Sequence, residues 1–195
     1  MDISESTTGN RVIVSVNVIG GVRRDLSAEQ TRWLLTQLDW VEEEIQRLQT
    51  TMMEDYTVKK RTVGKGVLTR QQAYELGAVG PTARGSGVAQ DVRQTGYAAY
   101  GELYFEPVVE SDGDCYARSN VRFREALASV DLIRRAIGKL PAGEVRTKVK
   151  GLKPPKGETV IRVEQPRGEL LYYFKGSGEK NLDRLRIRTP TFANI

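Results

Sequence analysis

The chain has 195 residues, of which 30 are lysine or arginine and 25 are aspartate or glutamate, so its formal net charge is +5. This length is typical of one domain, and the mild positive excess, with no nucleic-acid-binding motif beside the basic segment 148–157, argues against nucleic-acid binding. Because the sequence contains one cysteine and no histidine, it excludes a disulfide framework, a zinc site and a serine–histidine triad built from this chain alone.

The first predicted element is a half-buried strand at residues 11–18, where apolar residues alternate with polar ones. Ile13, on the opposite face, indicates that this side is partly covered as well. Gly20 and Gly21 are expected to end the strand. The residues that would share the buried face are Val12, Val14, Val16 and Val18.

A long helix is predicted over about residues 28–53. Ser27 and Gln30 form the S-x-x-Q pattern of a capping box at its start. Behind this cap, apolar residues recur every three or four positions in one stripe, which is typical of a helix that packs on other helices. The stripe consists of Leu34, Leu38, Val41, Ile45, Leu48 and Met52, with Trp33 and Trp40 beside it.

Two more helices are predicted further along the chain. A short one covers about residues 70–77 and is capped by Thr69, and a longer one covers about residues 120–137. Gly138 and Pro141 are residue types that end a helix and suit the end of the longer one. The apolar face of the longer helix consists of Phe123, Ala126, Leu127, Val130, Ile133 and Ile137.

The segment 77–96 between these helices is rich in glycine. It lacks the Gly-Lys-Ser/Thr of a phosphate-binding loop and the G-x-G-x-x-G spacing of a dinucleotide fold, so it is interpreted as a structural loop. The turn at residues 110–115 contains aspartates and glycine but not the twelve-residue calcium loop. We therefore expect no metal at this turn.

The last third of the chain predicts a three-stranded antiparallel meander, with strands at residues 159–163, 169–175 and 182–187. Turn residues separate all three strands. The fold class is therefore expected to be α+β, with two main helices, a short helix and a largely antiparallel sheet that includes this C-terminal meander.

The turn at residues 166–168 places an arginine between proline and glycine. In a meander, the end of the first strand, the start of the second and the end of the third lie at one edge, so Arg167 and residues 189–191 should meet there. Two interpretations are open: a binding site for an electron-rich group, and chance neighbours on a surface. With nothing bound, the guanidinium should be partly solvated or paired with Glu164 or Glu169.

Four separated stretches, in this order, resemble the large subunits of nickel–iron hydrogenases of the energy-converting, membrane-bound group. They also resemble the related quinone-side core subunit of respiratory complex I. The hydrogenase branch is favoured by the sequences at 81–87 and 188–195 and by the shortness of the segment 155–164. The stretches that carry the resemblance are residues 7–26, 80–93, 112–133 and 166–178 with 186–195.

The resemblance implies reversible proton reduction and hydrogen oxidation, with electrons exchanged with an iron–sulfur small subunit. It also implies membrane subunits as partners and a cytoplasmic location at the inner face of the cell membrane. No apolar run in the sequence approaches a membrane span, and residues 1–11 lack the apolar region of a signal peptide. The alternatives are a complex I-type quinone-reducing subunit and a metal-free scaffold that kept the fold.

In the family, the arginine of the Pro-Arg-Gly motif lies over the nickel–iron centre, and this catalytic role would fall on Arg167. Its suggested action is electrostatic, because an arginine is protonated at any ordinary pH. Pro166, Pro190 and Thr191 match positions in the environment of the iron's cyanide ligands. A nickel–iron centre is accordingly expected in the full-length subunit.

The chain departs from the family at the metal ligands, which are two cysteine pairs near the two ends of the family's subunits. Neither pair is present, and Cys115 lies in a segment that the family does not use for metal. Residues 1–195 are therefore expected to be a single central fragment that holds no metal or cofactor, is inactive alone, and self-associates through the exposed apolar face of its long helix. A chain shortened by design, an internal start codon and a natural remnant all fit this pattern.

Overall fold

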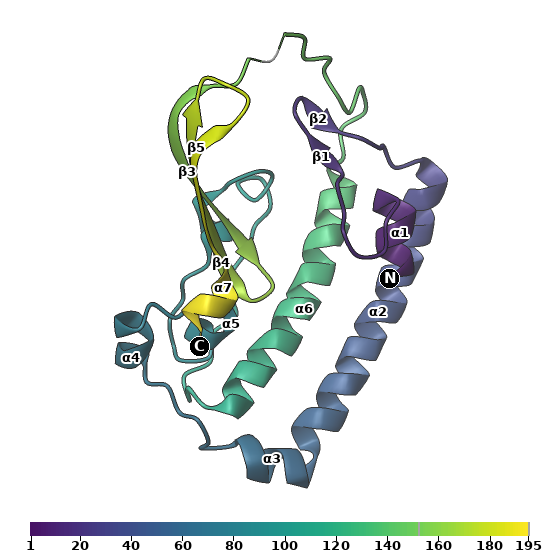
Figure 1. The fold of residues 1–195 in the computed structure, drawn as a ribbon. Helices are drawn as coiled ribbons and strands as arrows, with labels where there is room; N and C mark the ends of the chain where they lie inside the picture. Colours follow the sequence, from purple (N-terminus) through teal and green to yellow (C-terminus); the bar gives the residue numbers. More distant parts are fainter. Residues whose placement is uncertain (152, 195) are drawn as a thin grey trace.

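The computed structural model describes residues 1–151 and 153–194. Two long helices lie side by side, and a three-stranded sheet lies on the other side of the second one (Figure 1). The helices are α1 (Asp2–Thr8), α2 (Ala28–Glu54), α3 (Tyr56–Thr62), α4 (Arg70–Glu75), α5 (Gly80–Arg84), the 3₁₀ helix η1 (Val92–Thr95), α6 (Cys115–Gly138) and α7 (Pro190–Ala193). The strands are β1 (Asn17–Val18), β2 (Gly21–Val22), β3 (Lys156–Gln165), β4 (Gly168–Ser177) and β5 (Leu182–Arg188).

Helix α2 confirms the predicted long helix and its cap. The Ser27 hydroxyl accepts a hydrogen bond from the Gln30 amide at 3.1 Å, and the Gln30 side chain accepts one from the Ser27 amide at 3.0 Å. Leu34 and Leu38 are buried and pack with Val130 of α6. Leu48 and Met52, in the C-terminal part of the predicted stripe, are exposed, whereas the neighbouring Met53 is buried. Self-association through that exposed part stays a prediction.

Helix α6 begins at Cys115, earlier than the predicted start at Asn120. The reason is an N-cap that the apolar periodicity does not reveal: the Asp114 carboxylate accepts a hydrogen bond from the Ala117 amide at 2.7 Å. Helix α4 agrees with prediction in its start, since Thr69 and Gln72 form a capping box. It ends at Glu75, slightly before the predicted end.

The prediction of a strand over residues 11–18 is wrong for most of that segment. Only Asn17–Val18 pairs, with Gly21–Val22, in a short hairpin. Val12 and Ile13 are 73% and 74% exposed. Alternating apolar and polar residues form a strand only where a neighbouring strand pairs with their backbone. Among the described residues, no strand pairs with residues 11–16.

The C-terminal meander is confirmed, with strand order β3-β4-β5 and both pairs antiparallel. Gln165 pairs with Gly168, which leaves Pro166 and Arg167 as the tip of the turn between β3 and β4. Leu171 pairs with Arg188, so the end of β5 lies near this turn. With its helices and two antiparallel sheets, the chain has the expected α+β fold.

The part of the chain that the structure describes contains no helix with the length and apolar character needed to cross a membrane.

Candidate functional site

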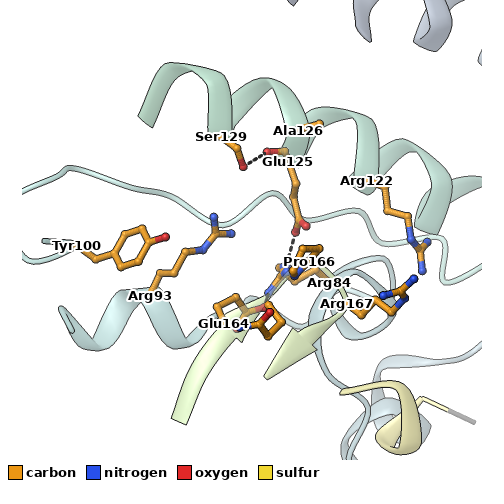
Figure 2. Close-up of a pocket in the computed structure, with 11 residues that line it drawn as sticks. Arg84, Arg93, Tyr100, Arg122, Glu125, Ala126, Ser129, Glu164, Pro166 and Arg167 are labelled. Atoms are coloured by element: carbon orange, nitrogen blue, oxygen red, sulfur yellow. Dashed lines mark hydrogen bonds and ion pairs between the residues drawn. The ribbon is translucent and has the colours of Figure 1, made fainter. Parts of the chain in front are cut away.

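A cavity of about 520 Å³ lies between α6 and the turn that joins β3 to β4. Its wall is made of side chains from α5, η1, the segment after η1, α6, the end of β3 and the β3–β4 turn, and most of them are polar (Figure 2). The lining residues are Arg84, Arg93, Tyr100, Arg122, Glu125, Ala126, Ser129, Glu164, Gln165, Pro166 and Arg167. Segments that are distant in sequence therefore meet around Arg167.

The turn that carries Arg167 is held by backbone contacts with α5. A Cβ atom placed on Gly168 would lie 2.6 Å from the backbone nitrogen of Gly80, so only glycines allow the two backbones to approach this closely. Asn194 adds a second link, because its side chain donates a hydrogen bond to the Arg167 carbonyl at 3.1 Å and accepts one from the Val79 amide at 3.0 Å. The turn thus has a defined position without any ligand.

These contacts lead to a prediction about two glycines with the same backbone conformation. Gly80 has φ +64° and touches the Arg167–Gly168 backbone, whereas Gly77 has φ +66° and open space within 4 Å of the point where a Cβ atom would lie. Gly77→Ala should therefore cost only the left-handed strain, about 1 kcal/mol. Gly80→Ala should cost about 1–3 kcal/mol more, because the two backbones must separate. Urea unfolding of both variants checks this, and equal losses would contradict it.

The structure places the sequence-predicted site residues at one end of the meander. Pro166 and Arg167 line the cavity, and Arg167 is exposed. Pro190 is buried at the start of α7, which contacts β4, and Thr191 is exposed on that helix. Because Asn194, just after α7, bonds to the Arg167 carbonyl, α7 and the turn lie at the same end of the sheet. Catalytic and ligand-environment roles for these residues stay predictions.

The expected ion pairs of Arg167 with Glu164 or Glu169 are not formed. Glu164 instead forms an ion pair with Arg84, at 3.0 Å. Glu169 forms one with Arg188 at 2.5 Å and a longer one with Arg162 at 3.4 Å. Both carboxylates are paired with arginines on other elements. Of the two expectations for the Arg167 guanidinium, the structure therefore agrees with solvation and not with pairing to Glu164 or Glu169.

A buried charge network below the cavity was missed by the sequence analysis, which interpreted residues 77–96 as a structural loop. That interpretation is wrong in part, because the segment contains α5 and η1 and carries Arg84, whose side chain is only 1% exposed. Glycine content suggested a loop, but here the glycines let α5 pack against other backbones. The feature of the sequence that could have predicted this buried charge is an arginine between closely spaced glycines.

Arg84 is the centre of this network. Its guanidinium contacts Asp91 at 3.0 Å and Glu164 at 3.0 Å, and it is also bonded to Glu125 of α6. Arg93 contacts Asp91 at 2.7 Å. The network therefore joins α5, η1, α6 and β3, the four elements that surround the cavity.

Burial shifts the protonation equilibria in the network. It raises the pKa of the Glu164 carboxyl above its ordinary value, although the Val92 amide and the Arg84 guanidinium oppose this shift. Burial by itself lowers the pKa of Arg84, but the hydrogen bond and charge of Glu125, with the charges of Asp91 and Glu164, raise that pKa in total. Arg84 therefore stays charged, and its partners hold it in one position.

The residues described do not fit a nickel–iron centre as ligands. They contain a single cysteine, Cys115, which begins α6 and whose sulfur accepts a hydrogen bond from Arg118 at 3.1 Å. Across residues 1–151 and 153–194, no group of three or more histidine, cysteine, aspartate or glutamate side chains is arranged to hold a metal ion. The cavity instead offers guanidinium groups and hydroxyls.

The chain is similar to several known proteins over nearly its whole length. The family model of the 49 kDa subunit of respiratory-chain NADH dehydrogenase matches residues 1–152 and 146–195. The carbon monoxide-induced hydrogenase of Rhodospirillum rubrum is 41% identical, over 99% of this chain and 54% of that protein. The membrane-bound hydrogenase subunit alpha of Pyrococcus furiosus is 37% identical, over 100% of this chain and 49% of that protein.

Subunits of NADH-quinone oxidoreductases and chains of solved structures also match. The C/D subunit of NADH-quinone oxidoreductase from Phocaeicola vulgatus is 35% identical, over 96% of this chain and 37% of that protein. A chain in the structure of the membrane-bound sulfane sulfur reductase, an archaeal respiratory membrane complex, superposes with a TM-score of 0.90 and 31% identity, over 98% of this chain and 54% of that one. The chain spans about half the length of the first two curated relatives and of this structural neighbour.

Proposed function

The chain belongs to the family of the 49 kDa subunit of respiratory-chain NADH dehydrogenase, and from this premise we propose that it is the central portion of the catalytic subunit of an energy-converting nickel–iron hydrogenase. Two hydrogenases, at 41% and 37% identity, are more similar to it than the NADH-quinone oxidoreductase subunit at 35%. The activity would be reversible proton reduction and hydrogen oxidation, carried out within a longer subunit.

The observation that supports this proposal best is the position of Arg167. The arginine lies at the tip of a turn fixed by Gly80, Gly168 and Asn194, and it faces a cavity of about 520 Å³. A guanidinium is protonated at any ordinary pH, so it cannot serve as a proton acceptor. A fixed positive charge can, however, stabilise negative charge that develops in the cavity during a reaction.

The nickel–iron centre itself would take its thiolate ligands from outside the residues described, since these contain one cysteine. We therefore assign no metal ligand to this chain and derive no step through the centre. The chain's own residues would act around it: Arg167 as the electrostatic group, with Pro166, Pro190 and Thr191 in the surrounding wall. Arg84 and its carboxylate partners would keep the elements around that wall together.

Partners and location follow from the same proposal. One relative is named as a subunit of a membrane-bound hydrogenase, another as a subunit of an NADH-quinone oxidoreductase, and the structural neighbour is named as an archaeal respiratory membrane complex. We propose that the chain works as a peripheral subunit at the inner face of the cell membrane, with an iron–sulfur small subunit and membrane subunits as partners. The charge of +5 gives no reason to add nucleic acid to these partners.

The second candidate is a quinone-reducing subunit of the complex I type, which is favoured by the 35% identity to an NADH-quinone oxidoreductase subunit. A metal-free scaffold that keeps the fold is the third. Purification of the complex that contains this chain separates the three. Stoichiometric nickel with hydrogen evolution from a reduced viologen dye is the expected result. Quinone reduction without nickel would favour the second candidate, and absence of both activities with no nickel would favour the scaffold.

A further inference from the structure

Two arginines in the cavity wall have no carboxylate partner among the described residues. Arg122 of α6 and Arg167 of the β3–β4 turn come from different elements, and Figure 2 shows their guanidinium groups pointing toward one another. The Arg122 guanidinium donates a hydrogen bond only within its own helix, to the Arg118 carbonyl at 2.7 Å. Two like charges that converge on one space repel each other unless an anion lies between them.

The carboxylates in the same wall do not compensate these two arginines. Glu125 and Glu164 both contact the buried Arg84, and Glu164 also accepts a hydrogen bond from the Val92 amide at 3.1 Å. The buried network comprises three carboxylates and two guanidinium groups, so its formal charge is −1. Adding Arg122 and Arg167 brings the formal charge of these groups to +1.

The protonation behaviour of Arg122 agrees with this excess. Partial desolvation of its guanidinium, the charge of Arg118 and the charge of Arg167 lower the pKa of Arg122, and only Glu125 opposes them, although the residue as a whole is exposed. An anion bound between Arg122 and Arg167 would remove the repulsion that contributes to this shift.

We propose that Arg122 and Arg167 form a binding site for an oxyanion, either a carboxylate or a phosphate-type group. Each guanidinium is a planar fork of donors that matches two oxygen atoms of such a group. The volume of about 520 Å³ exceeds the needs of one small anion, so the oxyanion can be part of a larger molecule. The site needs no metal and no reaction, so it can be tested independently of the hydrogenase proposal.

The test is titration of the full 195-residue chain with inorganic phosphate and with acetate, by calorimetry at low ionic strength, where charge interactions are least screened. Saturable binding at one site is expected. Arg122→Gln and Arg167→Gln should each weaken it about tenfold or more, the effect of losing one charge-assisted contact. Arg124→Gln is the matched control, since Arg124 lies on the same helix, outside the cavity, and pairs with Glu110; it should bind like the unsubstituted chain.

Absence of saturable binding in the unsubstituted chain, or an equal loss in the Arg124 variant, overturns the proposal. If a variant fails to fold, arginine side-chain NMR signals of the unsubstituted chain give the same answer, because two arginine resonances must shift with phosphate. A second arm uses the assembled complex to identify the source of the oxyanion. Phosphate binding that persists in the complex prepared without nickel and iron indicates a free oxyanion, whereas its loss in that preparation indicates a carboxylate from a neighbouring protein segment.

Discussion

Arg167→Lys in the assembled complex should retain its metal content and lose turnover by about a hundredfold or more. Lysine keeps the positive charge but presents it as a point, without the planar fork of donors. The turn around position 167 is held by the Gly80–Gly168 contact and by Asn194, which involve the backbone of Arg167 and not its side chain. The substitution should therefore change the group in the cavity and leave its support intact.

The measurement is kcat and KM for hydrogen evolution, with nickel and iron determined on the same preparation. A loss in kcat with an unchanged KM for the electron donor is expected, because the cavity group would act on the reaction and not on donor docking. Arg124→Lys, outside the cavity, serves as the control and should keep its turnover. Turnover of the Arg167 variant close to the control value would rule out the electrostatic role.

The largest loss of stability should follow from Arg84→Leu. Removing this guanidinium leaves Glu125 and Glu164 without their ion-pair partner, and the side chain of Glu164 is only 5% exposed. Asp91 keeps its contact with Arg93. Breaking a buried ion pair by removing one partner typically costs about 3–5 kcal/mol, because the remaining charge stays buried and unpaired. Urea unfolding should show a loss of that size in the free energy of unfolding.

Two controls make this expectation specific. Arg47→Leu removes an exposed pair with Glu44 and should leave the unfolding midpoint unchanged. The pH dependence gives the second control. Burial already raises the pKa of Glu164, and losing Arg84 removes one of the interactions that oppose this shift. A folded-state pKa above the unfolded value means that the folded state binds more protons, so the deficit of the Arg84 variant should shrink as pH falls toward about 5. A deficit independent of pH would contradict the charge explanation.

Elements whose pattern depends on their own residues could be predicted from the sequence. The capping boxes at Ser27 and Thr69 are completed by side chains three positions along, so α2 and α4 start where the sequence places them. The meander follows from alternating strands separated by turn residues, and its geometry alone puts the end of β5 near the β3–β4 turn. The exposed position of Arg167 at the tip of that turn could be predicted from the same pattern of strands and turn residues.

Other features depend on residues distant in the sequence, and only the tertiary structure decides them. Val12 and Val14 follow the alternation of a strand, but they remain exposed because no strand among the described residues pairs with them. The need for glycine at positions 80 and 168 is visible only in the tertiary structure, where the two backbones lie in contact. In the sequence, nothing distinguishes Arg84 from other basic residues. In the structure, α5, η1, α6 and β3 surround its side chain and bury it. Buried charges need partners that local sequence does not specify. For this reason the sequence determined the capped helices, the meander and the Arg167 turn, whereas the structure determined the cavity, its charge network and the convergence of Arg122 with Arg167.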